Sequence, residues 1–187
     1  MNDVIDPSWN FSESIYSDLV VSRDLVYDPC QFKCSTVTIE RESIEYGACS
    51  FKLNSCNVRF RVAKTTPTKI GQFVTLWKRV GDGPIQPYDV ADDVDFFIVT
   101  ARKDNNFGQF VFSKDVLSKY GVMSKNGSGG KRAIRVYPPW DITISDQAKK
   151  TQAWQLQYFL EIPTTKPISC ARVKILYGSL HANDTNF

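Results

Sequence analysis

The chain has 187 residues, of which 42% are hydrophobic and 13% aromatic, and its formal net charge is +3. This length suffices for one full core, and this composition excludes an extensively disordered protein. The start, MNDVIDPSWNF, lacks the cationic patch and apolar run of a secretory signal, and no segment approaches the roughly 20 apolar residues of a membrane helix. We therefore expect one intracellular domain, neither secreted nor inserted in a membrane, with its five cysteines reduced.

Charge is distributed unevenly along the chain. Residues 1–56 have four basic and nine acidic side chains, whereas residues 57–187 have nineteen basic and eleven acidic ones. A basic excess confined to one part of a chain is consistent with an anionic partner, although this excess is far smaller than that of a histone.

The first segment is expected to be helical. Within residues 8–25, apolar side chains recur at helical spacing at Trp9, Ile15, Leu19 and Val20. We expect residues 1–45 to form an N-terminal helical extension that packs on a single domain spanning residues 1–187.

A β-hairpin is expected next. The segments ACSFKLN and VRFRVAK (48–54 and 58–64) alternate apolar and polar side chains, and NSCN supplies the turn between them. Lys52, Arg59 and Arg61 then share one face of the hairpin. We interpret them as a solvated face, with ligand binding as the less favoured alternative.

Five further strands are expected at residues 72–80, 94–102, 107–112, 131–137 and 171–178. In the last of them, Val173, Ile175 and Tyr177 alternate with Arg172 and Lys174. Residues 81–93 contain two Pro, two Gly and several acids, and are expected to form a surface loop rather than a domain boundary.

Two helices interrupt the strands. Ser113 can cap a helix over residues 114–121, and Ser145 can cap a longer one over residues 146–162 that ends at Pro163. The sequence thus predicts an α+β fold in which a mostly antiparallel curled sheet, or an open barrel, is accompanied by two or three helices.

Candidate catalytic groups are sparse. The one histidine, His181, lies in a polar C-terminal tail, and neither Cys30 and Cys34 nor Cys49 and Cys56 have the common spacing of a zinc knuckle. The stretch GSGGKR lacks the preceding strand and the Lys-Ser or Lys-Thr of a P-loop. We therefore predict no catalytic residue, no metal and no cofactor.

One acidic group keeps a hydrolase open as an alternative. Asp92, Asp93 and Asp95 precede an apolar strand, and Arg102 and Lys103 follow it. This arrangement partly resembles the grouped acids and nearby cation of a metal-dependent nuclease site. A solvated acidic loop is the favoured interpretation.

The clearest functional signal is a basic, aromatic region. Residues 98–150 contain ten cations against four acids, and include the glycine-rich stretch NGSGGKRAIRVYPPWD at 126–141. Nucleic-acid surfaces combine cations for phosphates with planar groups for bases. We expect phosphate contacts from Lys125, Lys131, Arg132, Arg135, Arg102, Lys103, Lys149 and Lys150. Trp140 is expected either to stack on a base or to brace the loop. In the alternative, Tyr137 and Trp140 belong to the core and the cations only keep the surface soluble.

Residues 107–162 resemble the MepB family. The resemblance lies in three blocks, which occur in the order FGQFVFSKDVLSKYGVMS, GGKRAIRVYPPWD and QAKKTQAWQLQYFLEI. A weaker resemblance extends back to about Tyr46. The resemblance implies a fold similar to a DNA-binding pseudobarrel, shared by the effector domain of certain restriction enzymes and by plant transcription-factor domains. It therefore implies nucleic-acid binding by analogy of fold. Lys131, Arg132, Arg135 and Trp140 match the family block KR-x-x-R-V-Y-P-P-W.

The favoured function is a non-enzymatic nucleic-acid-binding domain, for DNA in the first place, that contacts phosphates through the loop at 125–135. One alternative is the metal-dependent nuclease or another nucleic-acid hydrolase. The other is an accessory protein that holds a small molecule or a protein in an apolar pocket at the mouth of the barrel. The sequence leaves the oligomeric state open.

Overall fold

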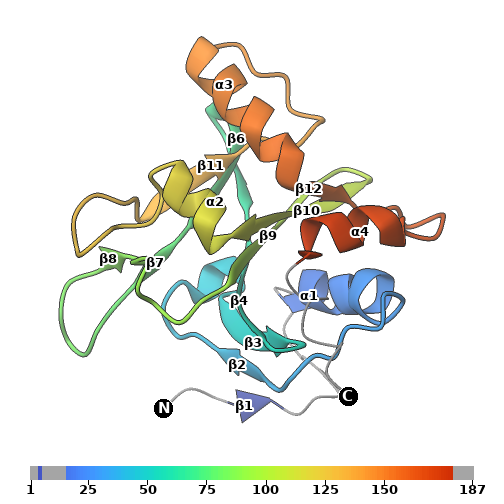
Figure 1. Ribbon diagram of the computed structural model, residues 1–187. Coiled ribbons are helices and arrows are strands. Elements are labelled where there is room, and N and C mark those ends of the chain that lie inside the picture. The colour runs from blue at the N-terminus through green and yellow to red at the C-terminus, as the bar shows by residue number, and fades with distance from the viewer. Residues whose placement is uncertain (1–3, 6–15, 179–187) are drawn as a thin grey trace.

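The computed structural model describes residues 4–5 and 16–178, and its main element is a seven-stranded sheet (Figure 1). The strands lie in the order β1-β2-β3-β4-β9-β10-β12. Neighbouring strands are antiparallel except for the parallel pair β4 and β9. Their bounds are β1 Val4–Ile5, β2 Val37–Ile39, β3 Cys49–Leu53, β4 Cys56–Val62, β9 Phe96–Lys103, β10 Asn106–Ser113 and β12 Phe159–Glu161.

Two smaller sheets complete the β-structure. In one, β6 (Lys69–Thr75) lies between β5 (Lys64–Thr66) and β11 (Ala133–Val136), so that β11 is an edge strand. In the other, β7 (Trp77–Lys78) pairs with β8 (Gln86–Pro87). The predicted α+β fold with mostly antiparallel sheets is confirmed, and the sheets do not close into a barrel.

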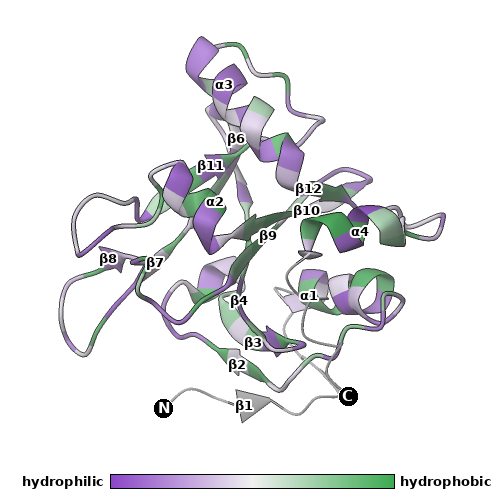
Figure 2. Cartoon of the chain, in the orientation of Figure 1, coloured by the Kyte–Doolittle hydropathy of each residue, from purple (hydrophilic) through white to green (hydrophobic). Residues whose placement is uncertain are grey.

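Both faces of the main sheet are buried at its centre. In β9, Phe96 and Ile98 face one hydrophobic cluster, whereas Phe97 and Val99 face a second one. A strand covered on both sides needs apolar residues at every position, which explains the continuous run FFIVTA. Figure 2 shows this hydrophobic centre at β9, β10 and β12.

Helices lie against both hydrophobic clusters. The first cluster lies under α1 (Ser17–Ser22), the π-helical turn Arg23–Tyr27 and α4 (Cys170–Leu176), which lie together on one side in Figure 1. The second receives residues from α2 (Lys114–Lys119) and α3 (Asp146–Gln155). Short 3-10 turns occur at Ile44–Tyr46 and Leu156–Tyr158. No helix in the described part of the chain is long and apolar enough to cross a bilayer.

The N-terminal segment packs on the sheet through its apolar side chains. Leu19 and Tyr27 are fully buried, and the Tyr27 ring meets the ring of Tyr177 edge-on at 6.3 Å. Trp9 and Ile15, which the helix prediction also used, lie outside the described residues. The extension predicted to be helical at residues 1–45 also contains a strand, because β2 lies within it and pairs with β3.

The predicted hairpin is confirmed as β3 and β4, and Lys52, Arg59 and Arg61 share one face of it, but the interpretation of this face as solvated is wrong for Arg61. Lys52 is exposed, whereas the Arg61 side chain is only 1% exposed and its guanidinium lies 2.5 Å from the Glu40 carboxylate. Burial alone would lower the pKa of Arg61, but the Glu40 carboxylate raises it, and the pKa is raised overall. Arg59 binds the other oxygen of Glu40 at 3.0 Å. A counter-charge that precedes the hairpin in the sequence therefore allows one cation to be buried.

The strand predicted at 171–178 is wrong, because this segment forms α4. Val173 and Tyr177 are buried, but Ile175 between them is 72% exposed. Residues four apart share a face of a helix as well as a face of a strand, so the two buried positions fit both periods. The Ser169 hydroxyl oxygen caps the helix by accepting from the Arg172 N–H at 3.4 Å.

The helix predicted over 146–162 begins as expected but ends early. The Ser145 hydroxyl accepts from the Ala148 N–H at 3.2 Å, as Ser113 does from Val116 at the start of α2. After Gln155 the chain makes one 3-10 turn and continues as β12. Phe159 and Leu160, which fall within the predicted helix, enter opposite clusters because they alternate across a strand.

Candidate functional site

The glycine-rich loop contains a tight turn. Lys125 and Ser128 exchange both backbone hydrogen bonds, at 3.0 and 3.1 Å. The two residues between them, Asn126 and Gly127, have φ of 54° and 73°. Positive φ at both central positions is typical of the two-residue hairpin turn that Asn-Gly favours. The glycine that allows this geometry therefore serves an ordered turn rather than a loose connection.

An acidic residue holds this turn in place. One Asp89 oxygen accepts from the Gly127 N–H at 2.9 Å and from the Ser124 hydroxyl at 2.7 Å, and the other accepts from the Ala91 N–H at 3.0 Å. These hydrogen bonds, above all that from Gly127, lower the pKa of Asp89 to about 2. The loop expected at 81–93 thus anchors the glycine-rich loop, a partnership that sequence reasoning missed because the two segments are far apart in the chain.

Gly130 completes the path from the turn to β11. Its φ is +81°, and a Cβ built on it would lie 2.7 Å from the Pro87 Cβ and from the Ser124 nitrogen. The Lys131 N–H then donates to the Val122 carbonyl at 2.8 Å. The chain can approach this closely only where a side chain is absent. The backbone of Lys131 is consequently fixed next to the end of α2.

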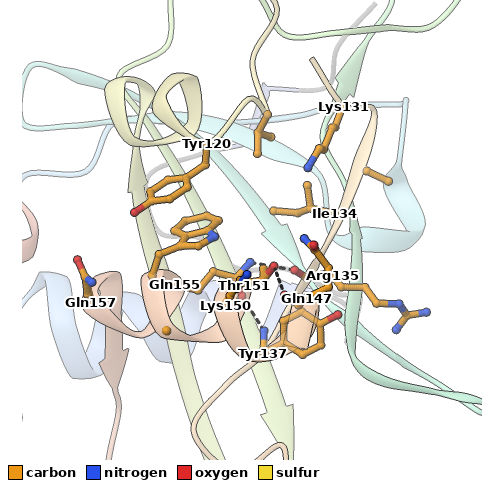
Figure 3. Close-up of a pocket in the computed structure, with 14 residues that line it drawn as sticks. Tyr120, Lys131, Ile134, Arg135, Tyr137, Gln147, Lys150, Thr151, Gln155 and Gln157 are labelled. Atoms are coloured by element: carbon orange, nitrogen blue, oxygen red, sulfur yellow. Dashed lines mark hydrogen bonds between the residues drawn. The ribbon is translucent and has the colours of Figure 1, made fainter. Parts of the chain in front are cut away.

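Two glutamines of α3 fasten this helix beside β11. The fully buried Gln155 donates to the Arg135 carbonyl and accepts from the Tyr137 N–H, both at 2.9 Å. It therefore occupies part of the free edge of β11. Gln152 donates to the carbonyls of Pro138 and Asp141, at 3.1 and 2.8 Å. Figure 3 shows the bonds of Gln155 as dashed lines.

A groove of about 790 Å³ lies between β11 and α3 (Figure 3). Lys131 and Arg135 line it from the side of β11, and Lys150 lines it from α3. The lining residues include no Asp, Glu, His or Cys. Tyr120 and Trp154, which also line it, are stacked with ring centroids 4.0 Å apart and planes 10° apart. The structure thus brings three of the predicted contact residues to one concave site, beside an aromatic pair that the prediction did not include.

Three more of the predicted cations are exposed but do not line this groove. Lys125, Arg132 and Lys149 are exposed, as are Lys131 and Lys150. Within the described part of the chain, none of these five forms an ion pair. Their charges are therefore free to act on a ligand.

Arg135 has a partly structural role. Its guanidinium donates to the Gly71 carbonyl at 3.0 Å and to the Thr66 hydroxyl at 2.9 Å, and lies 5.9 Å from the centre of the Phe73 ring. An arginine has five N–H donors, so three remain for a ligand.

The remaining predicted residues lie apart from the groove. Arg102 binds the buried Asp18 carboxylate of α1 at 2.8 Å, and Lys103 lies 3.7 Å from Asp141. Trp140 meets the Phe159 ring edge-on at 5.6 Å and lies against the second cluster. These contacts match the alternative in which Trp140 packs against the core.

The three acids of the nuclease alternative are engaged with neighbouring groups. Asp92 pairs with Lys78, while Asp93 and Asp95 accept from the side chain and the backbone N–H of Asn57, both at 2.7 Å. No group of three or more His, Cys, Asp or Glu able to hold a metal occurs among the described residues. His181 lies outside them.

These features define a small α+β protein in which an edge strand and a helix enclose a basic groove. The MepB-like family model matches residues 40–161, and the chain belongs to this family. It is similar to the crystal structure of MepB, with a TM-score of 0.68, 30% sequence identity, and coverage of 80% of this chain and 97% of that one. No curated protein matches the chain. The family match includes the groove but neither α1 nor α4.

Proposed function

We propose that this protein binds nucleic acid, DNA in the first place, through the groove between β11 and α3. The observation that carries the proposal is the position of Lys131 and Lys150. They come from different elements and line the same groove. The lining of the groove contains no Asp or Glu. Charges of one sign on the walls of a cleft reinforce one another and raise the local concentration of an anionic partner.

Further exposed cations extend this field. Arg132 directly follows Lys131 in the sequence, and Lys149 directly precedes Lys150. Both are exposed. Lys125 lies in the tight turn that Asp89 anchors. A polyanion that follows the groove could therefore place several phosphates near cations, and each neutralised phosphate adds to the salt dependence of binding.

The aromatic pair supplies a second kind of contact. Trp154 stacks on Tyr120 and also packs against Phe112, with ring centroids 5.4 Å apart, so it is held from two sides. A rigid aromatic surface beside cations is suited to nucleotides, because bases and sugars offer apolar faces next to their phosphates.

The groove is composed for binding rather than for hydrolysis. Its lining residues include no histidine and no carboxylate that could act as a general base or hold a metal. This composition supports a non-enzymatic role for the groove.

A fluorescence-anisotropy titration tests the proposal. Labelled single- and double-stranded DNA and RNA are titrated with the protein at roughly 50 to 300 mM salt, with and without magnesium. We expect saturable binding that weakens steeply with salt and leaves the probe intact. Shortening of the probe that requires magnesium would instead indicate a hydrolase. Absence of binding at the lowest salt would overturn the proposal.

A further inference from the structure

Two cysteines from opposite ends of the chain meet over the first face of the main sheet. The sulfur of Cys30 lies 3.2 Å from that of Cys170, although the residues are 140 positions apart. Cys30 follows the π-helical turn and is 9% exposed, whereas Cys170 is the first residue of α4 and is half-buried. Both are free thiols. We propose that Cys30 and Cys170 form a reversible disulfide when a peroxide oxidises them.

The packing around the two residues keeps their sulfurs together. Cys30 belongs to the first hydrophobic cluster, and Cys170 packs against it beside α4. A disulfide bond is about 2.05 Å long, so the sulfurs need to approach by roughly 1 Å. Among the described residues, no other pair of cysteine sulfurs makes such a contact. The fold therefore selects this pair from the five cysteines of the chain.

We infer the order in which the two thiols react from their unequal exposure to solvent. The more exposed Cys170 meets hydrogen peroxide first: its sulfur, as the thiolate, attacks one oxygen, the O–O bond breaks and hydroxide leaves, which gives a sulfenic acid. The Cys30 sulfur then attacks the Cys170 sulfur. The S–O bond breaks, and the departing oxygen leaves as water with the proton of Cys30. Two thiols are thereby oxidised and one peroxide is reduced to two waters.

The surroundings of Cys30 argue against the first role. Burial and, after it, the hydrogen bond with Cys170 raise the pKa of the Cys30 thiol to about 12. A thiol that keeps its proton at neutral pH is a poor first nucleophile. It is nevertheless held against the sulfur on which the sulfenic acid forms.

The family match spans residues 40–161, so the bond would join two segments that lie outside this match. A covalent link between Cys30 and Cys170 restricts the unfolded chain over most of its length and so stabilises the folded state. Oxidation would therefore fasten α4 to the N-terminal segment on the sheet. This inference is independent of the proposed nucleic-acid binding.

The test uses the full chain, reduced with dithiothreitol, freed of the reductant and exposed to equimolar hydrogen peroxide. We expect it to lose two of its five thiols, counted with Ellman's reagent in denaturant. A peptide map without reduction should contain one linked pair that joins Cys30 to Cys170. Tm should rise by roughly 5 to 15 °C and return to its starting value with dithiothreitol.

Two matched variants separate this pair from general oxidation. Cys56 is as buried as Cys30, so Cys56→Ser serves as the control and should keep both the linked peptide and the rise in Tm. Cys170→Ser should lose both. A wild-type peptide map that lacks the Cys30 to Cys170 link, or that contains another pair in its place, would overturn the proposal, and this result does not depend on the folding of any variant.

Discussion

The Asp89 carboxylate accepts a hydrogen bond from the backbone N–H of Gly127 at 2.9 Å. This bond joins the acidic loop before β9 to the glycine-rich loop before β11. The second loop leads directly into Lys131, so an acidic residue outside the groove helps to position a cation that lines it. The high glycine content next to a cluster of cations then has a structural reason: the glycines allow a tight turn and a close backbone approach at the entrance to β11.

The anchor by Asp89 predicts a dependence of stability on pH. The pKa of Asp89 in the folded state is about 2, below the ordinary value, because the hydrogen bonds favour the ionised carboxylate. Its contribution is fully present above about pH 4 and is lost as the pH falls towards 2. Thermal unfolding of the wild type and of Asp89→Asn should therefore differ most above about pH 4. A difference in Tm that stays constant down to pH 2 would contradict the assigned pKa.

The glycines of the loop should differ in their tolerance of alanine. Gly129 and Gly130 both have positive φ, but a Cβ on Gly129 meets nothing within 4 Å, whereas one on Gly130 lies 2.7 Å from Pro87. We expect Gly129→Ala to cost about 1 to 2 kcal/mol from backbone strain. Gly130→Ala should cost about 1 to 3 kcal/mol more because of the added overlap. Urea unfolding measures both, and equal losses would argue against the close approach at Gly130.

The buried ion pair predicts a large effect at Glu40. Glu40→Ala leaves the guanidinium of Arg61 buried next to an unfilled space, and should destabilise the fold by about 3 to 5 kcal/mol. The control is Glu42→Ala, because Glu42 pairs with Arg79 at the surface and should contribute less than about 1 kcal/mol. Replacing Glu40 and Arg61 together by leucine should recover much of the loss. If the two single variants were equally stable in urea, Arg61 would not depend on Glu40.

Substitution of Trp140 distinguishes a structural role of this residue from a role in binding. Its contact with Phe159 predicts that Trp140→Ala lowers the free energy of unfolding by about 3 kcal/mol, as expected when a large aromatic side chain is removed from a packed site. Affinity for DNA, measured well below the Tm of the variant, should remain close to that of the wild type. Weakened binding at unchanged stability would identify Trp140 as a stacking platform instead.

Local patterns in the sequence were sufficient for several elements. The serine caps at Ser113 and Ser145 marked the starts of α2 and α3, and alternation marked β3 and β4. These features depend on neighbours within a few residues. The same kind of pattern failed at α4, because Val173 and Tyr177 fit a helix and a strand equally well.

Long-range partners explain what local patterns could not indicate. The acid that holds Arg102 is Asp18, which is 84 residues away, and the edge of β11 is partly occupied by a side chain, that of Gln155. The predicted basic site in the later part of the chain includes Lys131 and Lys150, which the structure places in one groove. It missed Tyr120 and Trp154, because their stacking exists only once α2 and α3 have been placed together.

The most direct test removes the two groove lysines and compares the loss with that at a distant pair. Lys131→Ala with Lys150→Ala is compared with Lys33→Ala with Lys52→Ala, in which the exposed control lysines lie at and near β3, far from α3 in Figure 1. Anisotropy titrations with duplex DNA at several salt concentrations give affinity and salt slope. We predict that the groove variant binds more weakly and that its salt slope is smaller by about 1 to 2, with Tm unchanged, while the control variant resembles the wild type. Equal affinities and slopes for both variants would contradict the groove as the nucleic-acid site.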